Sequence, residues 1–167
     1  MAAPVRSFVL GYGDATNRDT LEYMRTFARE GAADPLTRRT VAAILTTVPR
    51  SDRTGAAVMI RGWLADRWRF VADPKGLERV TTPHQLLLDF QRTATLAGDC
   101  DDVAVLAASM GLIAGLRSRY VAVGFEGPTR PVRHVFAELA TPLGWVDMDI
   151  TRPADIPPVN RVITVDI

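Results

Sequence analysis

The sequence predicts an α+β domain: a helical N-terminal half, a central buried helix, and an antiparallel sheet packed on that helix. Three observations favour this class. Helix-capping residues and helical apolar spacing dominate before residue 98, and short runs that alternate apolar and polar residues dominate after residue 118. Between them, residues 103–116 contain only one conventionally polar side chain, Ser109. A helix that is apolar on every side must be surrounded by the rest of the fold.

The first half carries start and stop signals for several helices. Asp19 suits the cap of a helix that reaches residue 30, with Gly31 as its stop. Asp34 and Pro35 suit the start of a second helix. The other elements expected before residue 98 are a strand at residues 7–10, a helix at residues 55–66, an extended segment at residues 69–72 and a helix opened by Thr82 and Pro83.

Short strands are expected after the central helix. The runs at residues 119–126, 132–139 and 145–150 suit an antiparallel meander packed on that helix. In the third run, the alternation predicts that Trp145, Asp147 and Asp149 share one face. Residues 162–165 are expected to form a final edge strand.

Size and composition fit one globular domain. We treat residues 1–167 as a single unit with a helical lead-in at about 16–98, a core at about 98–151 and a tail at 152–167. Hydrophobic residues make up 47% and charged residues 23%, which excludes a disordered or fibrous chain. The formal net charge of +1 leaves no electrostatic footprint for a nucleic-acid partner.

The sequence predicts neither a membrane span nor a cofactor. The N-terminal residues lack the apolar run and cleavage site of a secretory signal peptide, so we expect synthesis in the cytoplasm. The longest mostly apolar run, residues 103–116, is shorter than the roughly 20 residues that cross a bilayer. The single cysteine excludes an internal disulfide and a zinc cluster made of cysteines.

That cysteine, Cys100, lies at the expected start of the central helix, in the segment GDCDD. A free thiol has a pKa of about 8.5, and a helix N-terminus or a neighbouring imidazolium stabilises its thiolate. His134, on the second strand expected after the central helix, could supply the imidazole, and a carboxylate on the third strand could orient it. Asp149 and Asp147 both fit that role. His84 has no such context, and we expect it at the surface.

Three aspartates flank the cysteine. Negative charge near a thiol raises its pKa. Asp99 suits the N-cap, while Asp101 and Asp102 fall in the first turn, where the helix dipole favours acids by roughly 0.3 to 1 kcal/mol each. We therefore expect their carboxylates to point away from the sulfur. They lack the alternating oxygen ligands and the glycine of a calcium loop, so no metal site is predicted.

The order of the segments GDCDD, RHVFAEL and WVDMDIT resembles the transglutaminase-like superfamily of papain-like cysteine enzymes. The resemblance covers about residues 16–151 and is to the short bacterial and phage members. It implies a papain-like core in which Cys100 is the nucleophile, His134 the general base and Asp149 the residue that orients it. The backbone N–H of Cys100 could donate to the oxyanion, with Gln91 or a tryptophan as a second donor.

These residues favour cysteine-dependent acyl transfer on peptide or isopeptide amides, with a thioester intermediate and with hydrolysis preferred over cross-linking. The resemblance to phage members implies cell-wall peptides or virion proteins as substrates, and incorporation in a phage particle. Two alternatives remain open at this point. One is a virion structural or assembly protein that keeps the fold with an inactive triad, and the other is a peptide-binding module without turnover.

Overall fold

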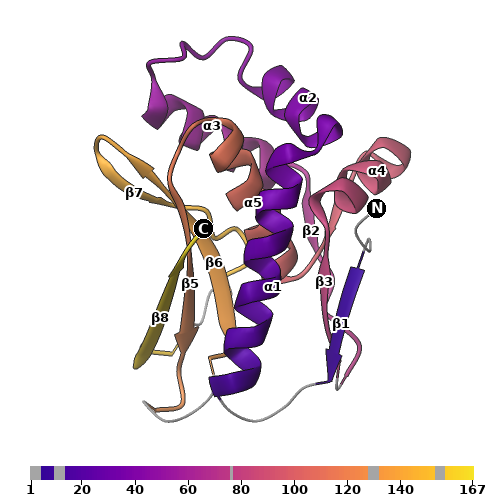
Figure 1. Ribbon diagram of the computed structural model, residues 1–167, viewed down its shortest axis with the longest axis vertical. Coiled ribbons are helices and arrows are strands. Elements are labelled where there is room, and N and C mark those ends of the chain that lie inside the picture. Colours follow the sequence, from indigo (N-terminus) through magenta and orange to yellow (C-terminus); the bar gives the residue numbers. More distant parts are fainter. Residues whose placement is uncertain (1–4, 10–13, 76, 128–131, 153–156) are drawn as a thin grey trace.

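The computed structural model describes residues 5–9, 14–75, 77–127, 132–152 and 157–167. Within these ranges the helices and four short strands come first, and the four strands of the main sheet follow the last helix (Figure 1). The helices are α1 (Asp14–Ala33), α2 (Pro35–Ile44), α3 (Arg53–Ala65), α4 (Pro83–Thr93) and α5 (Cys100–Ile113). The strands are β1 (Val5–Val9), β2 (Trp68–Phe70), β3 (Leu77–Thr81), β4 (Leu96–Gly98), β5 (Ser118–Gly124), β6 (His134–Thr141), β7 (Gly144–Asp147) and β8 (Arg161–Asp166).

Helix α5 is the centre of the fold. It packs against α1 on one side and against β6 on another, and α3 and α4 also contact it (Figure 1). Every residue from Asp101 to Gly111 is buried. The hydroxyl of Ser109 donates a hydrogen bond to the carbonyl of Val105, one turn earlier in the same helix, at 2.8 Å. The predicted α+β class, with a central buried helix on an antiparallel sheet, is therefore confirmed.

The main sheet has the order β7-β6-β5-β8, and all its neighbours are antiparallel. Strands β5, β6 and β7 form the predicted meander, and β8 is the predicted edge strand beside β5. Two further pairs, β1 with β3 and β2 with β4, lie outside this sheet. Strands β3 and β4 were not expected, because three to five residues are too few to show a periodic pattern.

The first helix differs from its prediction at both ends. It begins at Asp14 instead of Asp19 and continues through Gly31 to Ala33. Gly31 is not a stop signal, because a Cβ atom at this position would lie 2.5 Å from Pro83 Cγ and 2.6 Å from Ser109 Oγ. The glycine lets α1 approach the start of α4 and the middle of α5. Close packing between helices, which no local pattern reveals, is the reason for its presence.

The third predicted strand is shorter than expected. Strand β7 ends at Asp147, so Asp147 and Asp149 do not share a strand face. The backbone N–H of Asp149 instead donates to Asp147 Oδ1 at 2.6 Å. The chain therefore turns directly after β7, and this turn carries Asp149.

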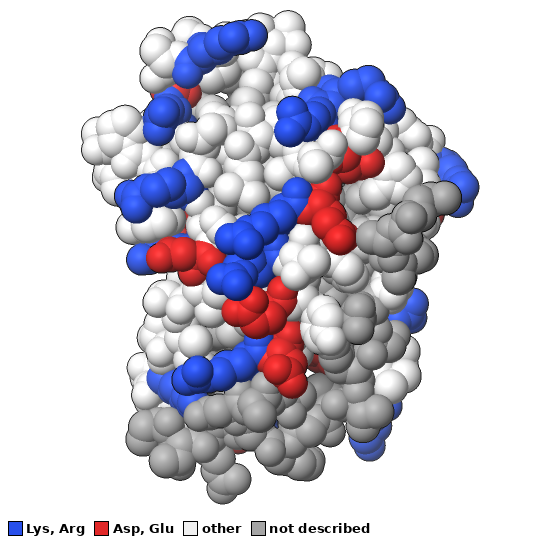
Figure 2. All heavy atoms as spheres, in the orientation of Figure 1, with Lys and Arg blue, Asp and Glu red and all other residues white. Residues whose placement is uncertain are grey.

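The surface over α1 is polar and mixed in charge. Figure 2 shows basic and acidic side chains interspersed on this face. On α1 itself the exposed charged residues include both signs, namely Arg18, Asp19, Glu22, Arg29 and Glu30. Among the described residues, no helix combines the length and the apolar character needed to cross a membrane.

The fit of α5 against β6 can be tested at Gly111. A Cβ atom there would overlap Leu139 Cδ2 and lie 2.8 Å from Ser118 Oγ, and both side chains are buried. Overpacking of this kind costs about 1 to 3 kcal/mol, so we expect Gly111→Ala to lower the free energy of unfolding in urea denaturation. Gly62 in α3 is the control, since a Cβ atom there meets nothing within 4 Å.

Gly62→Ala should raise the free energy of unfolding by about 0.5 to 1 kcal/mol, because alanine favours the helix more than glycine does. A Gly111→Ala variant as stable as Gly62→Ala would contradict the close packing of α5 on β6.

Candidate active site

Cys100 is the first residue of α5, as predicted, and it is partly exposed. Strand β4 leads into it, and Asp99 occupies the N-cap position. The backbone N–H of Val135 in β6 forms a hydrogen bond that favours the thiolate of Cys100. Because Val135 follows His134, the N-terminus of α5 lies against the beginning of the strand that carries the histidine.

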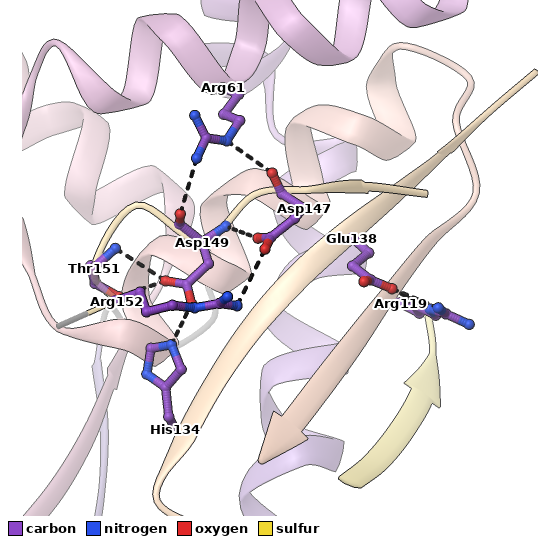
Figure 3. Close-up of polar contacts among 8 residues, drawn as sticks. All are labelled: Arg61, Arg119, His134, Glu138, Asp147, Asp149, Thr151 and Arg152. Carbon is purple, nitrogen blue, oxygen red and sulfur yellow. Dashed lines mark hydrogen bonds and ion pairs between the residues drawn. The ribbon is translucent and has the colours of Figure 1, made fainter. Parts of the chain in front are cut away.

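His134 is the first residue of β6, and its ring contacts Asp149. The distance from His134 Nε2 to Asp149 Oδ2 is 2.6 Å (Figure 3). The two side chains are 9% and 1% exposed, so this contact is shielded from water. Of the two aspartates that the sequence offered, Asp149 is the one that meets the imidazole. Asp147 accepts instead from the backbone of Asp149 and from Arg152.

Four donors surround the Asp149 carboxylate. Its Oδ1 accepts from the backbone N–H of Thr151 at 3.1 Å and from the Thr151 hydroxyl at 3.4 Å. Its Oδ2 accepts from His134 and from Arg152 Nε at 2.9 Å. Burial by itself would raise the pKa of Asp149, but the hydrogen bonds from His134, Arg152 and Thr151 outweigh it and lower that pKa. The carboxylate is therefore ionised at neutral pH.

A second arginine holds the backbone of the same turn. Arg61 in α3 donates from Nε to the carbonyl of Asp147 at 2.9 Å and from Nη2 to the carbonyl of Asp149 at 3.3 Å (Figure 3). No local sequence pattern predicts this contact, because the partners are 86 and 88 residues apart. Arg152 is closer, three residues after Asp149, and that spacing was the only signal available.

The thiol environment differs from the expectation. Burial and the charges of Asp99, Glu78 and Asp149 raise the pKa of Cys100 to about 12, and the Val135 N–H only partly offsets them. Among the hydrogen bonds of the described residues, none joins Cys100 to His134. The partial charge of the helix N-terminus is therefore outweighed by burial and by nearby carboxylates, and the resting thiol is neutral.

The aspartates around Cys100 only partly follow the prediction. Asp102 is directed towards β3, where its Oδ1 accepts from the backbone N–H of Thr81 at 2.6 Å. Burial raises the pKa of Asp102 to about 7. The charge of Asp99, in contrast, raises the pKa of Cys100, so this carboxylate does influence the thiol.

Asp101 is fully buried, and its two oxygens accept no hydrogen bond from a described residue. Burial, followed by the neighbouring Asp99, raises the pKa of Asp101 well above its usual range and so favours the protonated carboxyl group, which can donate a hydrogen bond. Side-chain oxygens of Asp99, Asp101 and Asp102 lie within 4.8 Å of one another. Among the described residues, these three aspartates form a group that could hold a metal ion.

The remaining candidates lie apart from this turn. His84 is half exposed and its Nδ1 lies 2.9 Å from Asp34 Oδ1, in agreement with the predicted surface position. Gln91 lines a cavity of about 540 Å³ with Trp63 and Phe90, and neither Cys100 nor His134 is among the residues around this cavity.

Trp68 in β2 differs from the other candidates for an oxyanion donor. Its Nε1 is buried and has no hydrogen-bond partner among the described residues. Strand β2 runs parallel to β4, the strand that leads into Cys100, and Trp68 lies opposite Leu96. Trp68 therefore combines a buried indole N–H that has no partner among the described residues with a place on the strand beside the one that leads to Cys100.

Comparison with known proteins agrees with the fold. Residues 39–150 match the sequence profile of the transglutaminase-like superfamily. No curated protein matches the sequence significantly. A crystal structure of a protein from Cytophaga hutchinsonii that is assigned to the cysteine proteases is similar, with a TM-score of 0.50 and 15% identity over 69% of this chain.

The present chain spans only 36% of the length of that protein, and at 15% identity the likeness concerns the fold alone. It confirms the papain-like core. The family profile covers more than half of the sequence and includes Cys100, His134 and Asp149. The chain therefore belongs to the transglutaminase-like superfamily.

Proposed function

We propose that the protein catalyses cysteine-dependent acyl transfer on an amide, with Cys100 as nucleophile, His134 as general base and Asp149 as the residue that orients the imidazole. The observation that carries this proposal is the shielded bond of 2.6 Å between His134 Nε2 and Asp149 Oδ2, next to the helix that begins with a thiol. Since Asp149 engages Nε2, the other ring nitrogen, Nδ1, is available to exchange a proton with the thiol.

The neutral resting thiol favours general-base catalysis over a preformed ion pair. His134 Nδ1 accepts the proton of Cys100 as the sulfur attacks the amide carbonyl, and a carbon–sulfur bond forms. The tetrahedral intermediate then breaks its carbon–nitrogen bond, and the imidazolium returns the proton to the leaving amine. A thioester remains. Water attacks it, His134 takes a proton from the water, and the thiol leaves with that proton as the carboxylic acid forms.

The negative oxygen of the tetrahedral intermediate needs donors. The backbone N–H of Cys100, at the N-terminus of α5, is one candidate. Trp68 is the better supported of the side-chain candidates, because its buried indole N–H has no partner within the described part of the chain, whereas Gln91 lines a separate cavity. We therefore extend the proposal to Trp68 as the second donor.

As substrates we propose peptide or isopeptide amides, with water as the acyl acceptor. Membership of the superfamily supports an amide as the group attacked. Cell-wall peptides and virion proteins are the first substrates to test, because the sequence resembles the short bacterial and phage members. A chain that binds such peptides without cleaving them would be a binding module, and one without either property would fit a structural role.

The triad can be tested with single variants and a fluorogenic peptide amide. We expect Cys100→Ala, His134→Ala and Asp149→Asn each to lower kcat/KM by about 10² to 10⁴, since they remove the nucleophile, the general base and the carboxylate that orients the base. Asp147→Asn should cost less, because Asp147 does not touch the imidazole. His84→Ala is the control and should keep full activity. Greater loss from Asp147→Asn than from Asp149→Asn would overturn the assignment.

The raised thiol pKa predicts how fast Cys100 reacts with iodoacetamide. At pH 8 the wild-type thiol should react far more slowly than a free thiol, whose pKa is about 8.5. Glu78→Gln removes a negative charge that raises the pKa of Cys100. The variant should therefore have a lower thiol pKa and react several-fold faster with iodoacetamide, as expected for the loss of one nearby charge. Glu126→Gln, which removes an exposed carboxylate paired with Arg133, is the matched control. Equal rates for both variants would contradict the charge effect.

The oxyanion role of Trp68 is tested by Trp68→Phe, which removes the N–H and keeps an aromatic ring. Loss of one oxyanion donor lowers kcat by about 10² to 10³ in known cases, and we expect a reduction of at least tenfold with little change in KM. Trp63→Phe serves as the control, because Trp63 packs edge-on against Phe90 beside the separate cavity. An unchanged kcat in Trp68→Phe would exclude this donor.

A further inference from the structure

The buried carboxylate of Asp149 requires a positive charge beside it. Its side chain is only 1% exposed, and transfer of an unpaired carboxylate into such a site is strongly unfavourable. The Thr151 donors on Oδ1 are neutral. Both potentially charged donors, His134 Nε2 at 2.6 Å and Arg152 Nε at 2.9 Å, share the other oxygen, Oδ2 (Figure 3).

His134 cannot supply this charge throughout a reaction. In the proposed mechanism the imidazole accepts a proton from Cys100 and later returns it, so it is neutral during part of every cycle. A guanidinium stays protonated at any pH at which the protein is folded. Among the described residues, Arg152 is therefore the partner of the Asp149 carboxylate whose charge does not change.

We propose that Arg152 is the permanent counter-ion of Asp149 and a positioning residue, which keeps the carboxylate ionised and directed at His134 whether the imidazole is neutral or charged. This inference rests on the proposed function, because only a histidine that cycles between two protonation states needs such a partner.

Arg152 is itself held from two sides. Its Nη2 lies 3.2 Å from Asp147 Oδ2, and its guanidinium lies over the ring of Phe136, 5.2 Å from the ring centre. Arg152 and Asp147 are 45% and 44% exposed, so their ion pair contributes little stability by itself. The ion pair between Arg152 and Asp147 instead orients the guanidinium, so that its Nε points towards Asp149.

The elements packed around Asp149 contribute the other groups that influence its charge. Strand β6 contributes His134, α5 contributes Cys100, and the turn itself contributes Arg152 and Asp147. Arg61 of α3 binds the main-chain carbonyl of Asp149 rather than its carboxylate. Removal of Arg152 therefore leaves the carboxylate with neutral donors whenever the imidazole is neutral.

The test is a titration of the Asp149 carboxyl carbon by NMR in the full chain. In Arg152→Gln the pKa of Asp149 should rise, because a charged donor that lowers it is lost. Arg152→Lys keeps the charge and should restore much of the wild-type titration. Arg133→Gln is the matched control. It removes the same charge from the residue before His134, but Arg133 pairs with the exposed Glu126.

Equal midpoints in wild type and Arg152→Gln, or equal shifts in Arg152→Gln and Arg133→Gln, would overturn the proposal. The titration needs no turnover, so it decides the role of Arg152 even if the proposed acyl transfer fails. Where the protein is active, Arg152→Gln should lower kcat on the order of tenfold and change KM less than twofold, because Arg152 acts through Asp149 and not on the substrate. A change confined to KM would assign Arg152 to substrate binding instead.

Discussion

The complete burial of α5 is the constraint on which the rest of the structure depends. A helix without a polar face has to be covered on all sides, so α1, α3, α4 and the main sheet surround it. This arrangement also determines which residues of α5 can reach a substrate. Only the ends of such a helix can reach the surface, and Cys100 is its first residue. The strand that covers α5 most extensively, β6, begins with His134, and the two residues are brought together by the packing of their elements.

The second constraint is electrostatic, since the site buries several carboxyl groups around one thiol. Asp149 and Asp101 show how the same side chain reaches opposite states. Donors on both oxygens lower the pKa of Asp149 in spite of its burial. Asp101 is buried beside acidic neighbours and has no donor among the described residues, so its pKa is raised and its neutral form is favoured. The site therefore keeps a carboxylate next to the imidazole and holds the thiol in its neutral form.

Much of the fold could be predicted from local signals because those signals act over one turn of chain. Asp34 caps α2 through the backbone N–H of Thr37 and Thr82 caps α4 through that of Gln85, as the capping rule requires. The apolar stretch of α5 and the alternation of β5 and β6 were equally clear. Strands β3 and β4 were not, because very short strands depend on their partners. Gly31 was misinterpreted for the same reason, since its cause is the contact of α1 with Pro83 and Ser109.

The sequence alone determined the fold class and the family resemblance, and it offered Cys100, His134 and either Asp149 or Asp147 as candidate site residues, because residue type, order and periodicity are local properties of the chain. Only the tertiary structure decided between Asp149 and Asp147 as the partner of the imidazole, since β7 ends before Asp149. It also decided the neutral state of the thiol and the roles of Arg61 and Arg152. These depend on distances between separate elements and on burial, which alter charge interactions far more than sequence spacing can indicate.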